Sequence, residues 1–424
     1  MHISDLGLSP LRLAPWRNRL AALSLLLMAA GCAPLQPPST GPAAATRPPV
    51  ILVSIDGMRP DYLNRSITPN LSRLAANGVR AEAMIPSFPS KTFPNHYTLV
   101  TGLRPDHHGV VDNTMEDPRI PGERFTLSNT TAVGDRRWWD GAEPVWVTAE
   151  KHKVRTATMF WPGSEAAIHG VRPTRYATFD GKVSANARTD TLLGWLDGGK
   201  AQGLGFLTLY FDDVDHAGHE QGPDSPMVND ALAKVDQALG RLLDGLAARK
   251  LEANIIVVSD HGMASVSNTR VIRIDQMAPA GSYRVISSGT FAGLEPVEGQ
   301  AAVLEQALLQ PREHVECWRK AEIPARFEFG KNARVPTYFC LAEPGWTLAT
   351  NDKSAQKTKG GAHGYDHRAP DMRATFIAAG PAFRNGVVLP PFDNVDVYPL
   401  LMQLVGLKPL PSDGHLEPLL PALR

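Results

Sequence analysis

The hydrophobic pattern of the chain predicts a series of buried strands. The first is a short, continuous run of apolar and β-branched residues, which is typical of a parallel strand that is covered on both faces. The runs are residues 50–55, 154–161, 205–211, 254–259 and 374–380. Since apolar residues dominate the runs at 50–55, 205–211 and 254–259 on both faces, these three strands are expected in the middle of a sheet rather than at its surface.

Helical patterns lie between these runs. Thr68 followed by Pro69 predicts an N-cap and a first helical residue, and Gly78 predicts the end of that helix. Further helices are predicted at residues 185–196, 228–246 and 395–405. Strands that alternate with helices predict an α/β fold, with helices that flank a mostly parallel central sheet.

The rhythm of strands and helices is interrupted at residues 281–350. In this segment polar and apolar residues alternate more than in the runs above, for example at Arg326-Phe327-Glu328-Phe329. The pattern predicts a small α+β insert.

The first 32 residues predict an export signal of the lipoprotein type. Basic residues precede a short apolar run, residues 20–30, which is too short to span a bilayer comfortably. Small residues then lead to Cys32, as in a bacterial lipobox, in which this cysteine becomes the lipidated N-terminus. A plain secretory signal, cut near Ala30 or Ala33, is the alternative.

Residues 33–48 are rich in proline and alanine and predict a tether between the membrane and a catalytic domain at residues 49–424. We therefore expect an exported, periplasmic protein, held to the membrane through a lipid anchor if Cys32 is acylated. In an exported chain, Cys317 and Cys340 predict one disulfide, with two unpaired core thiols as the alternative.

The charge of the chain is balanced, with 43 basic and 43 acidic residues. This balance gives no reason to expect a nucleic-acid polymer as a partner, and nothing in the sequence implies a protein partner. A substrate phosphate would have to be bound locally.

Acidic residues and histidines follow three of the predicted strands. Asp56 follows the first, Asp215 and His219 follow the strand at 205–211, and Asp260-His261 follow the next. In open α/β sheets, sites lie beyond the carboxyl ends of the strands, so these side chains are expected to gather. Mixtures of carboxylate and imidazole suit zinc, and two neighbouring metal ions suit phosphoryl transfer.

Thr92 is the candidate nucleophile. It lies between Pro89 and Pro94, which stiffen the segment, and just before a predicted helix that ends near Gly102. A hydroxyl at a helix start can be presented to an anion, but it needs a base or a metal for activation. A rigid surface loop is the alternative for this stretch alone.

Several short motifs follow one another along the chain. They are Asp56-Gly57-Met58-Arg59, Lys91-Thr92-Phe93-Pro94-Asn95-His96, Asn113, Trp161-Pro162-Gly163-Ser164, Asp215 with Gly218-His219, Asp260-His261-Gly262-Met263, and His363-Gly364-Tyr365. These motifs resemble the nucleotide pyrophosphatase/phosphodiesterases of the alkaline phosphatase superfamily. The resemblance extends from about residue 49 to 410, with the motifs in the order of the family, and is nearest to bacterial members that consist of the catalytic domain alone.

The resemblance implies two zinc ions and hydrolysis through a covalent phospho-threonine intermediate at Thr92. Asp215, His219 and His363 match the ligands of one zinc, and Asp56, Thr92, Asp260 and His261 match the ligands of the other. Asn113 matches a residue that holds a phosphate oxygen. Phe93 and Tyr210 match aromatic positions that bind a nucleobase, Trp161 lies in the same pocket motif, and Phe179 is at a position where the family often has Tyr. Asp212 and His216 match no ligand position.

The leading hypothesis is therefore a phosphodiesterase or pyrophosphatase that cuts nucleotides or related phosphodiesters. A diesterase for choline-phosphate or lysophospholipid head groups, or a phosphomonoesterase of the same superfamily, is the alternative. A surface lipoprotein with a purely structural metal site is the competing class, although a structural site needs no nucleophile such as Thr92. If the chain is extended at Lys91, its side chain should point away from Thr92, which favours diesters over monoesters.

Overall fold

The computed structural model of the protein describes residues 47–197 and 203–424. The predicted signal segment, Cys32 and nearly all of the predicted tether lie outside the described residues. Within the described ranges, none of the helices combines the length and the apolar character that crossing a membrane requires.

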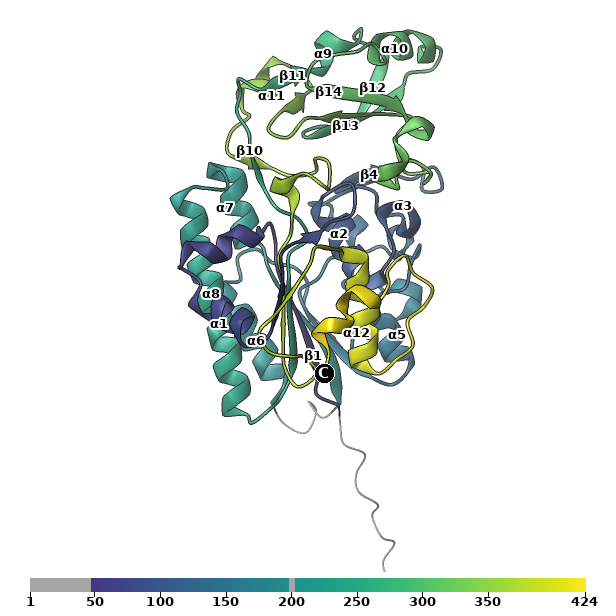
Figure 1. Ribbon diagram of the computed structural model, residues 1–424. Coiled ribbons are helices and arrows are strands. Elements are labelled where there is room, and N and C mark those ends of the chain that lie inside the picture. Colours follow the sequence, from purple (N-terminus) through teal and green to yellow (C-terminus); the bar gives the residue numbers. More distant parts are fainter. Residues whose placement is uncertain (1–46, 198–202) are drawn as a thin grey trace, which may run out of the picture. The chain divides into compact units, whose positions relative to one another are not determined.

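An eight-stranded sheet forms the centre of the fold (Figure 1). Its strand order is β19-β2-β18-β9-β1-β8-β6-β7, and every neighbouring pair is parallel except those made by β18. The strands are β1 (Val50–Ile55), β2 (Val79–Ala81), β6 (Arg155–Met159), β7 (Arg175–Tyr176), β8 (Leu204–Phe211), β9 (Asn254–Val258), β18 (Phe376–Ala379) and β19 (Val387–Leu389). The predicted α/β fold with a mostly parallel central sheet is confirmed.

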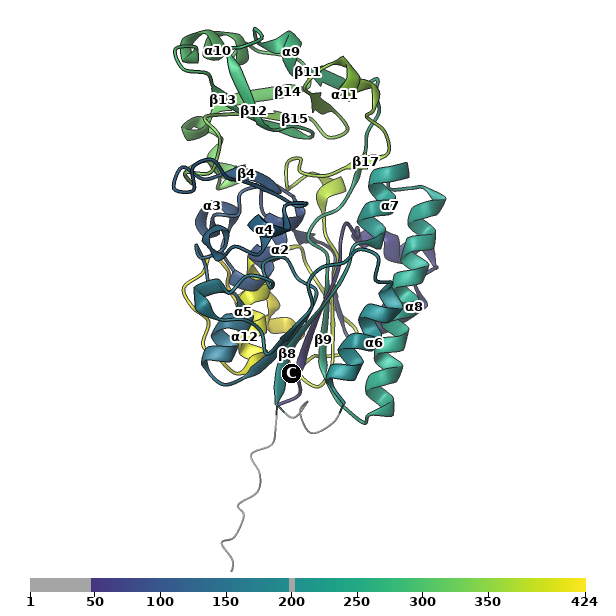
Figure 2. The same ribbon diagram turned by 180° about the vertical axis from the view of Figure 1, so that it is seen from behind.

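Helices cover both faces of the sheet, with α1, α6, α7 and α8 on one side and α2, α3, α5 and α12 on the other (Figures 1 and 2). The central strand β1 explains the unbroken apolar runs: Val50 and Leu52 pack into one core, and Ile51, Val53 and Ile55 into the other. These helices are α1 (Pro69–Ala76), α2 (Thr92–Thr101), α3 (Pro105–His108), α5 (Val145–Lys151), α6 (Ala185–Trp195), α7 (Asp213–Gln221), α8 (Pro226–Ala248) and α12 (Val397–Val405).

A four-stranded antiparallel sheet lies within the segment that breaks the βαβ rhythm. Its order is β12-β13-β15-β14. The strands are β12 (Tyr283–Ser287), β13 (Phe291–Pro296), β14 (Val315–Arg319) and β15 (Tyr338–Ala342), and α10 (Ala301–Leu308) lies between β13 and β14. Cys317 and Cys340 lie opposite each other in β14 and β15 and form a disulfide with an S–S length of 2.06 Å.

The alternation around Phe327 does not form a strand. A 3-10 turn spans Ala325–Phe327 instead. Phe327 and Phe329 are both buried because their rings pack on Phe88, at 4.4 and 5.3 Å between centroids. The pattern therefore reflected two aromatic anchors and not the two faces of a sheet.

The remaining elements are short. Two-stranded sheets pair β3 (Met84–Ile85) with β20 (Phe392–Asp393), β4 (Thr114–Glu116) with β5 (Arg124–Thr126), β10 (Ala264–Ser265) with β17 (Gly361–Ala362), and β11 (Val271–Arg273) with β16 (Thr347–Ala349). The short helices are α4 (Thr130–Val133), α9 (Ile274–Met277) and α11 (Asp352–Gln356).

Candidate active site

The predicted ligand residues meet at one edge of the central sheet. The strands β8, β1 and β9 are parallel neighbours, so the segments that follow their carboxyl ends come together. Helix α7 begins directly after β8 and holds two of the predicted ligands one turn apart. The residues that gather here are Asp56, Thr92, Asp215, His219, Asp260, His261 and His363.

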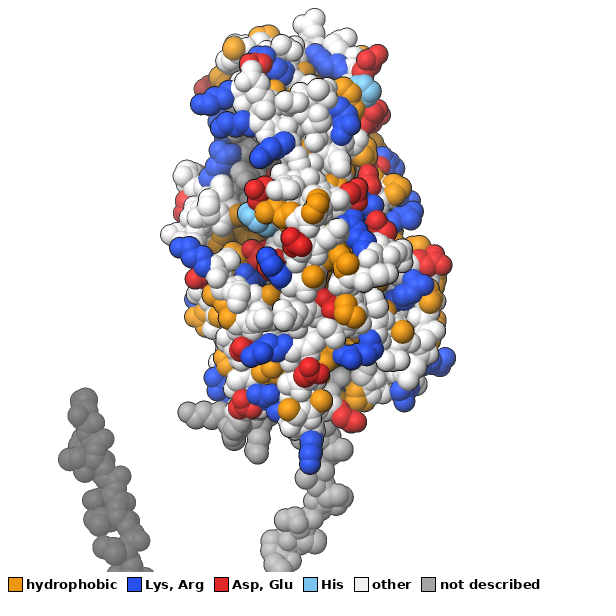
Figure 3. All heavy atoms as spheres, turned by 90° about the vertical axis from the view of Figure 1, so that its left-hand side faces the viewer, with side chains coloured by type: hydrophobic (Ala, Val, Ile, Leu, Met, Phe, Trp, Pro, Cys, Tyr) orange, Lys and Arg blue, Asp and Glu red, His pale blue; other side chains and the backbone are white. Residues whose placement is uncertain are grey.

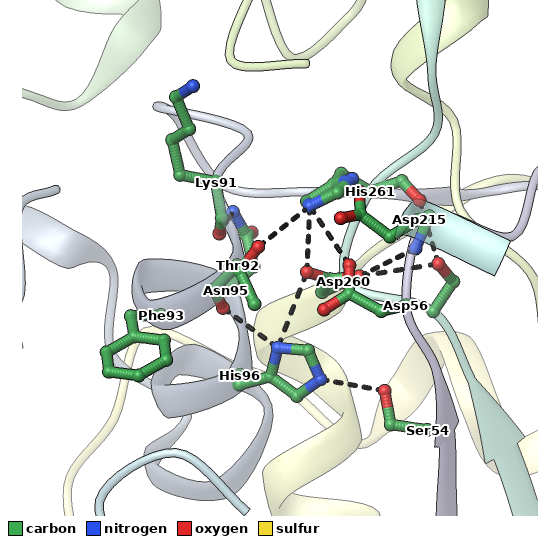
Figure 4. Close-up of polar contacts among 12 residues, drawn as sticks. Ser54, Asp56, Lys91, Thr92, Phe93, Asn95, His96, Asp215, Asp260 and His261 are labelled. Atoms are coloured by element: carbon green, nitrogen blue, oxygen red, sulfur yellow. Dashed lines mark hydrogen bonds and ion pairs between the residues drawn. The ribbon is translucent and has the colours of Figure 1, made fainter. Parts of the chain in front are cut away.

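His261 is at the centre of the first set of contacts (Figure 4). Its Nε2 atom lies 2.9 Å from Oδ2 of Asp260 and 3.4 Å from Oδ1 of Asp56. The same Nε2 atom is 3.3 Å from Oγ1 of Thr92. The candidate nucleophile is thus in direct contact with the cluster that could activate it.

Asp215 is at the centre of the second set. Its carboxylate lies 3.4 Å from Nε2 of His219 and 3.6 Å from Nε2 of His363. The rings of His261 and His363 stack, with centroids 3.5 Å apart. His261 therefore contacts both predicted ligand sets, and its ligand atom lies within 4.8 Å of those of Asp215 and His363.

The three imidazoles are oriented in the same way. Nδ1 of His219 lies 2.8 Å from the carbonyl oxygen of Gly361, and Nδ1 of His261 lies 2.9 Å from that of Gly262. Nδ1 of His363 lies 2.9 Å from the carbonyl oxygen of Ser90. Because a carbonyl oxygen can only accept, these contacts place the N–H on Nδ1 and leave the Nε2 lone pairs facing inward.

This orientation creates a need for a cation. The Nε2 atoms of His219 and His363 are 3.1 Å apart, and two lone pairs at that distance repel each other. A metal ion bound by both nitrogens removes the repulsion, and a carbonyl contact at Nδ1 is the usual support of a metal-bound histidine.

The carboxylates lead to the same conclusion. Among the described residues, Oδ1 of Asp56, Oδ1 of Asp215 and Oδ2 of Asp260 are buried without a hydrogen-bond partner. Burial, together with the charges of Asp260 and Asp215, raises the pKa of Asp56 well above its usual range. Since an unpaired buried carboxylate costs several kcal/mol, the donor set fits metal ions.

Thr92 is the first residue of α2, and only 8% of it is exposed. The free N–H groups and the dipole at this end of a helix favour a bound anion. The backbone N–H of Phe93 donates to Oδ1 of Asn113 at 2.9 Å, which places the Asn113 side chain over the helix start. Asn113 also lines the cavity that contains Lys91.

Lys91 extends away from the Thr92 hydroxyl (Figure 4). Its ammonium lies 5.4 Å from the ring centroid of Phe291 and lines a separate cavity of about 450 Å³. Burial lowers its pKa, although Asp112 opposes this effect.

His96 is a buried member of the site to which the sequence analysis gave no role. Its Nδ1 atom lies 2.8 Å from the backbone oxygen of Thr92 and 3.4 Å from Oδ2 of Asp260. Its Nε2 atom lies 2.8 Å from Oγ of Ser54 on β1. Because protein groups engage both nitrogens, His96 connects the nucleophile's backbone to Asp260 rather than offering a free lone pair.

A cavity of about 280 Å³ lies beside Thr92. Its walls include the predicted residues Phe93, Trp161 and Tyr210, and also Phe160 and Phe179. The hydroxyl of Tyr210 donates to Oδ2 of Asp56 at 2.7 Å, so this residue also holds a candidate ligand. Phe179 is 45% exposed, whereas Phe160, Trp161 and Tyr210 are buried.

The surface agrees with a locally bound substrate. On the face drawn in Figure 3, acidic and basic side chains are interspersed over most of the area. This mixture matches the equal numbers of acidic and basic residues in the chain.

The model of the type I phosphodiesterase / nucleotide pyrophosphatase family matches residues 50–366. The chain belongs to this family. An uncharacterized pyrophosphatase/phosphodiesterase of Schizosaccharomyces pombe is 38% identical over 88% of this chain and 80% of its own length. Family member 3 of the rat ectonucleotide pyrophosphatase/phosphodiesterases is 35% identical over 90% of this chain, which spans 45% of that relative.

Solved structures of the family agree with the fold. Human ectonucleotide pyrophosphatase/phosphodiesterase 5 superposes with a TM-score of 0.84 at 33% identity, covering 89% of this chain and 100% of the other. The murine protein, solved as an inactive threonine-to-alanine variant in complex with AMP, gives a TM-score of 0.85 with the same identity and coverage.

These comparisons confirm the predicted family and its enzyme class, a hydrolase that acts on phosphodiester bonds. The relatives named above are eukaryotic, so the predicted bacterial, catalytic-domain-only type stays a prediction. The family and the cluster of Asp and His side chains together support metal binding.

Proposed function

We propose that the protein is a zinc-dependent phosphodiesterase and pyrophosphatase that hydrolyses nucleotides and related phosphodiesters through a covalent intermediate on Thr92. The observation that carries the proposal is the position of the Thr92 hydroxyl, at a helix N-terminus and 3.3 Å from Nε2 of His261. A nucleophile beside inward-facing ligand atoms has no purpose in a metal site that is only structural.

Two zinc ions would be held by the residues that gather at the sheet edge. Asp215, His219 and His363 are the proposed ligands of one, and Asp56, Thr92, Asp260 and His261 the proposed ligands of the other. When bound, zinc would lower the pKa of the Thr92 hydroxyl and offset negative charge on the phosphoryl oxygens.

The chain's own residues then carry the reaction. The hydroxyl proton of Thr92 passes to solvent, Oγ1 attacks phosphorus in line, and a new P–O bond forms. The bond to the leaving group breaks on the opposite side, and the leaving oxygen of the alcohol or phosphate takes up a proton from water. The amide of Asn113 donates to a non-bridging oxygen as charge develops there. Water then attacks phosphorus, the bond to Thr92 breaks, and the hydroxyl is regenerated. Two in-line displacements give net retention at phosphorus.

The cavity beside Thr92 supports a nucleotide ester as the substrate. Phe93 and Phe179 offer aromatic faces to a flat substituent, and Trp161 and Tyr210 form deeper parts of the wall. Among the described residues that line this cavity there is neither Lys nor Arg, so the extra charge of a monoester has no cationic partner there. The AMP bound by the murine relative is consistent with this class of substrate.

Comparing two substrates tests the proposal. The kcat/KM for the 4-nitrophenyl ester of thymidine 5′-monophosphate should exceed that for 4-nitrophenyl phosphate by roughly 10³-fold. Equal values would make the protein a phosphomonoesterase. Faster turnover of glycerophosphocholine than of the nucleotide ester would instead favour a diesterase for lipid head groups.

The location and the domain organisation are further parts of the proposal. Residues 1–32 would direct export to the periplasm, Cys32 would carry a lipid anchor, residues 33–48 would form a tether, and residues 49–424 the catalytic domain of a bacterial enzyme. Mass spectrometry of the mature protein should find a lipid-modified Cys32 at the N-terminus; an unmodified Cys32 would remove the anchor but not the proposed activity.

A further inference from the structure

Arg188 is a buried cation that the reaction described above does not use. It lies in the first half of α6, and only 1% of it is exposed. A buried guanidinium is costly unless its N–H groups and its charge are fully paired. Its partners therefore show what the fold uses it for.

All of these partners belong to the walls of the cavity or to the segments behind them. Nη1 lies 2.7 Å from Oδ1 of Asp212 and donates to the carbonyl oxygen of Tyr210 at 3.0 Å. Nε donates to the carbonyl oxygen of Val183 at 2.8 Å. The guanidinium thus joins the loop before α6 to the end of β8, directly beside the ligands on α7.

The guanidinium also supports the aromatic wall. Its carbon lies 5.3 Å from the ring centroid of Phe160 and 5.7 Å from that of Phe179, within the range of cation–π attraction. The Phe179 ring is edge-on to Phe160 at 5.3 Å and to Tyr210 at 6.0 Å. Phe179 lies between β7 and α6, outside both elements. Because its backbone is not part of a helix or strand, these side-chain contacts are what hold its half-exposed ring in place.

The pair with Asp212 has an electrostatic consequence. The Asp212 side chain is 31% exposed and lines the cavity, where an unpaired carboxylate would repel an anionic substrate. Arg188 pairs with that carboxylate from behind the wall and is not itself among the residues that line the cavity.

We infer that Arg188 is a positioning residue that sets the selectivity of the cavity for substrates with a large, flat substituent. It does so by holding the Phe179 ring in place and by neutralising Asp212. The inference rests on the proposed function, because it concerns the substituent end of the same site. It predicts that loss of Arg188 weakens binding of nucleotide esters but spares the reaction at phosphorus.

Two esters with the same leaving group separate these effects. The 4-nitrophenyl ester of thymidine 5′-monophosphate occupies the cavity, whereas methyl 4-nitrophenyl phosphate presents only a methyl group to it. In the zinc-loaded Arg188→Met variant, kcat/KM should fall roughly 10- to 100-fold for the nucleotide ester, mainly through KM, and less than about 3-fold for the methyl ester. The ratio of the two values in one preparation does not depend on the folded fraction, so partial misfolding cannot imitate the result.

Three further variants complete the test. Arg188→Lys keeps the positive charge but loses the planar guanidinium. It should lower kcat/KM for the nucleotide ester relative to the methyl ester, but by less than Arg188→Met does. Phe179→Ala should reproduce the selective loss, and adding Arg188→Met to it should cost less than the two single losses combined. Arg249→Met removes an arginine that pairs with Asp197 and a backbone carbonyl elsewhere, and should leave the ratio unchanged.

Equal losses on both esters in Arg188→Met and Arg188→Lys would mean a general structural role and would overturn the inference. So would an unchanged ratio, or full additivity with Phe179→Ala. Wild-type protein that turns over neither ester would instead refute the proposed function, before any variant is compared.

Discussion

The residues around Thr92 lie at a helix start and at strand ends, whereas Phe179, at the other end of the site, lies in a loop. Thr92 begins a helix, Asp56 directly follows β1, and Asp260 lies two residues after the end of β9, which pairs with β1. Phe179 lies in the segment between β7 and α6. Its ring contacts Arg188, Phe160 and Tyr210, and its backbone N–H donates to the carboxylate of Glu165.

The difference matches the two tasks of the site. A nucleophile and its metal ions must be positioned to well under 1 Å. Strands and helix ends are rigid enough to hold them that precisely. Recognition of a flat substituent needs only an apolar face at the right place. Changes at the first end should therefore abolish turnover on every substrate, and changes at the second should alter preference.

The largest effect is expected from loss of the nucleophile. Thr92→Ala should lower kcat by roughly 10⁴-fold or more, on nucleotide and methyl esters alike, because no other hydroxyl of the described residues contacts Nε2 of His261. Thr92→Ser keeps a hydroxyl and should retain much of the activity. Rates in Thr92→Ala near those of the wild type would refute the assignment.

Loss of a ligand should come next. Elemental analysis of the wild type should find about two zinc ions per chain, as the donor set suits two neighbouring sites. Asp215→Ala removes the carboxylate that contacts His219 and His363, and should lower the zinc content and lower turnover roughly 10³-fold. Glu220→Ala, on the same helix and exposed, is the matched control. Active wild-type protein without zinc would contradict the prediction.

A smaller loss is expected at the phosphate oxygen. Asn113→Ala should lower kcat for diesters by roughly 10²-fold, the usual scale for one lost donor to a developing oxyanion. Asn113→Asp has the same shape but adds a negative charge beside the phosphate, so it should be slower than the alanine variant. If both variants had the same kcat as the wild type, Asn113 would have no part in binding the phosphate.

The smallest effect is expected at the aromatic end. Phe93→Ala should raise KM for the nucleotide ester by roughly 10-fold, since one aromatic contact is lost, with little change for the methyl ester. Phe93→Leu keeps most of the packing against Phe125 and Trp139 and isolates the loss of the ring face. A fall in kcat on both esters would erase the distinction between the two ends.

The reacting end could be predicted from sequence because its chemistry follows local signals. A continuous apolar run predicts a buried strand, and the acidic residue or histidine after it is then placed at the edge where sites form. The spacing of Asp215 and His219 predicts one helical face, and α7 has both residues. The prolines around Thr92 predict a stiff start to a helix, which α2 has.

The sequence by itself determined the parallel core, the candidate ligands and the candidate nucleophile, because each depends on a run or a spacing of a few residues. The tertiary structure alone decided the contacts that support them. His96 reaches Ser54 across 42 residues and Arg188 reaches Tyr210 across 22, distances at which no periodicity relates one side chain to another. Such contacts depend on which surfaces the strands and helices bury against one another, and only the packed fold specifies that.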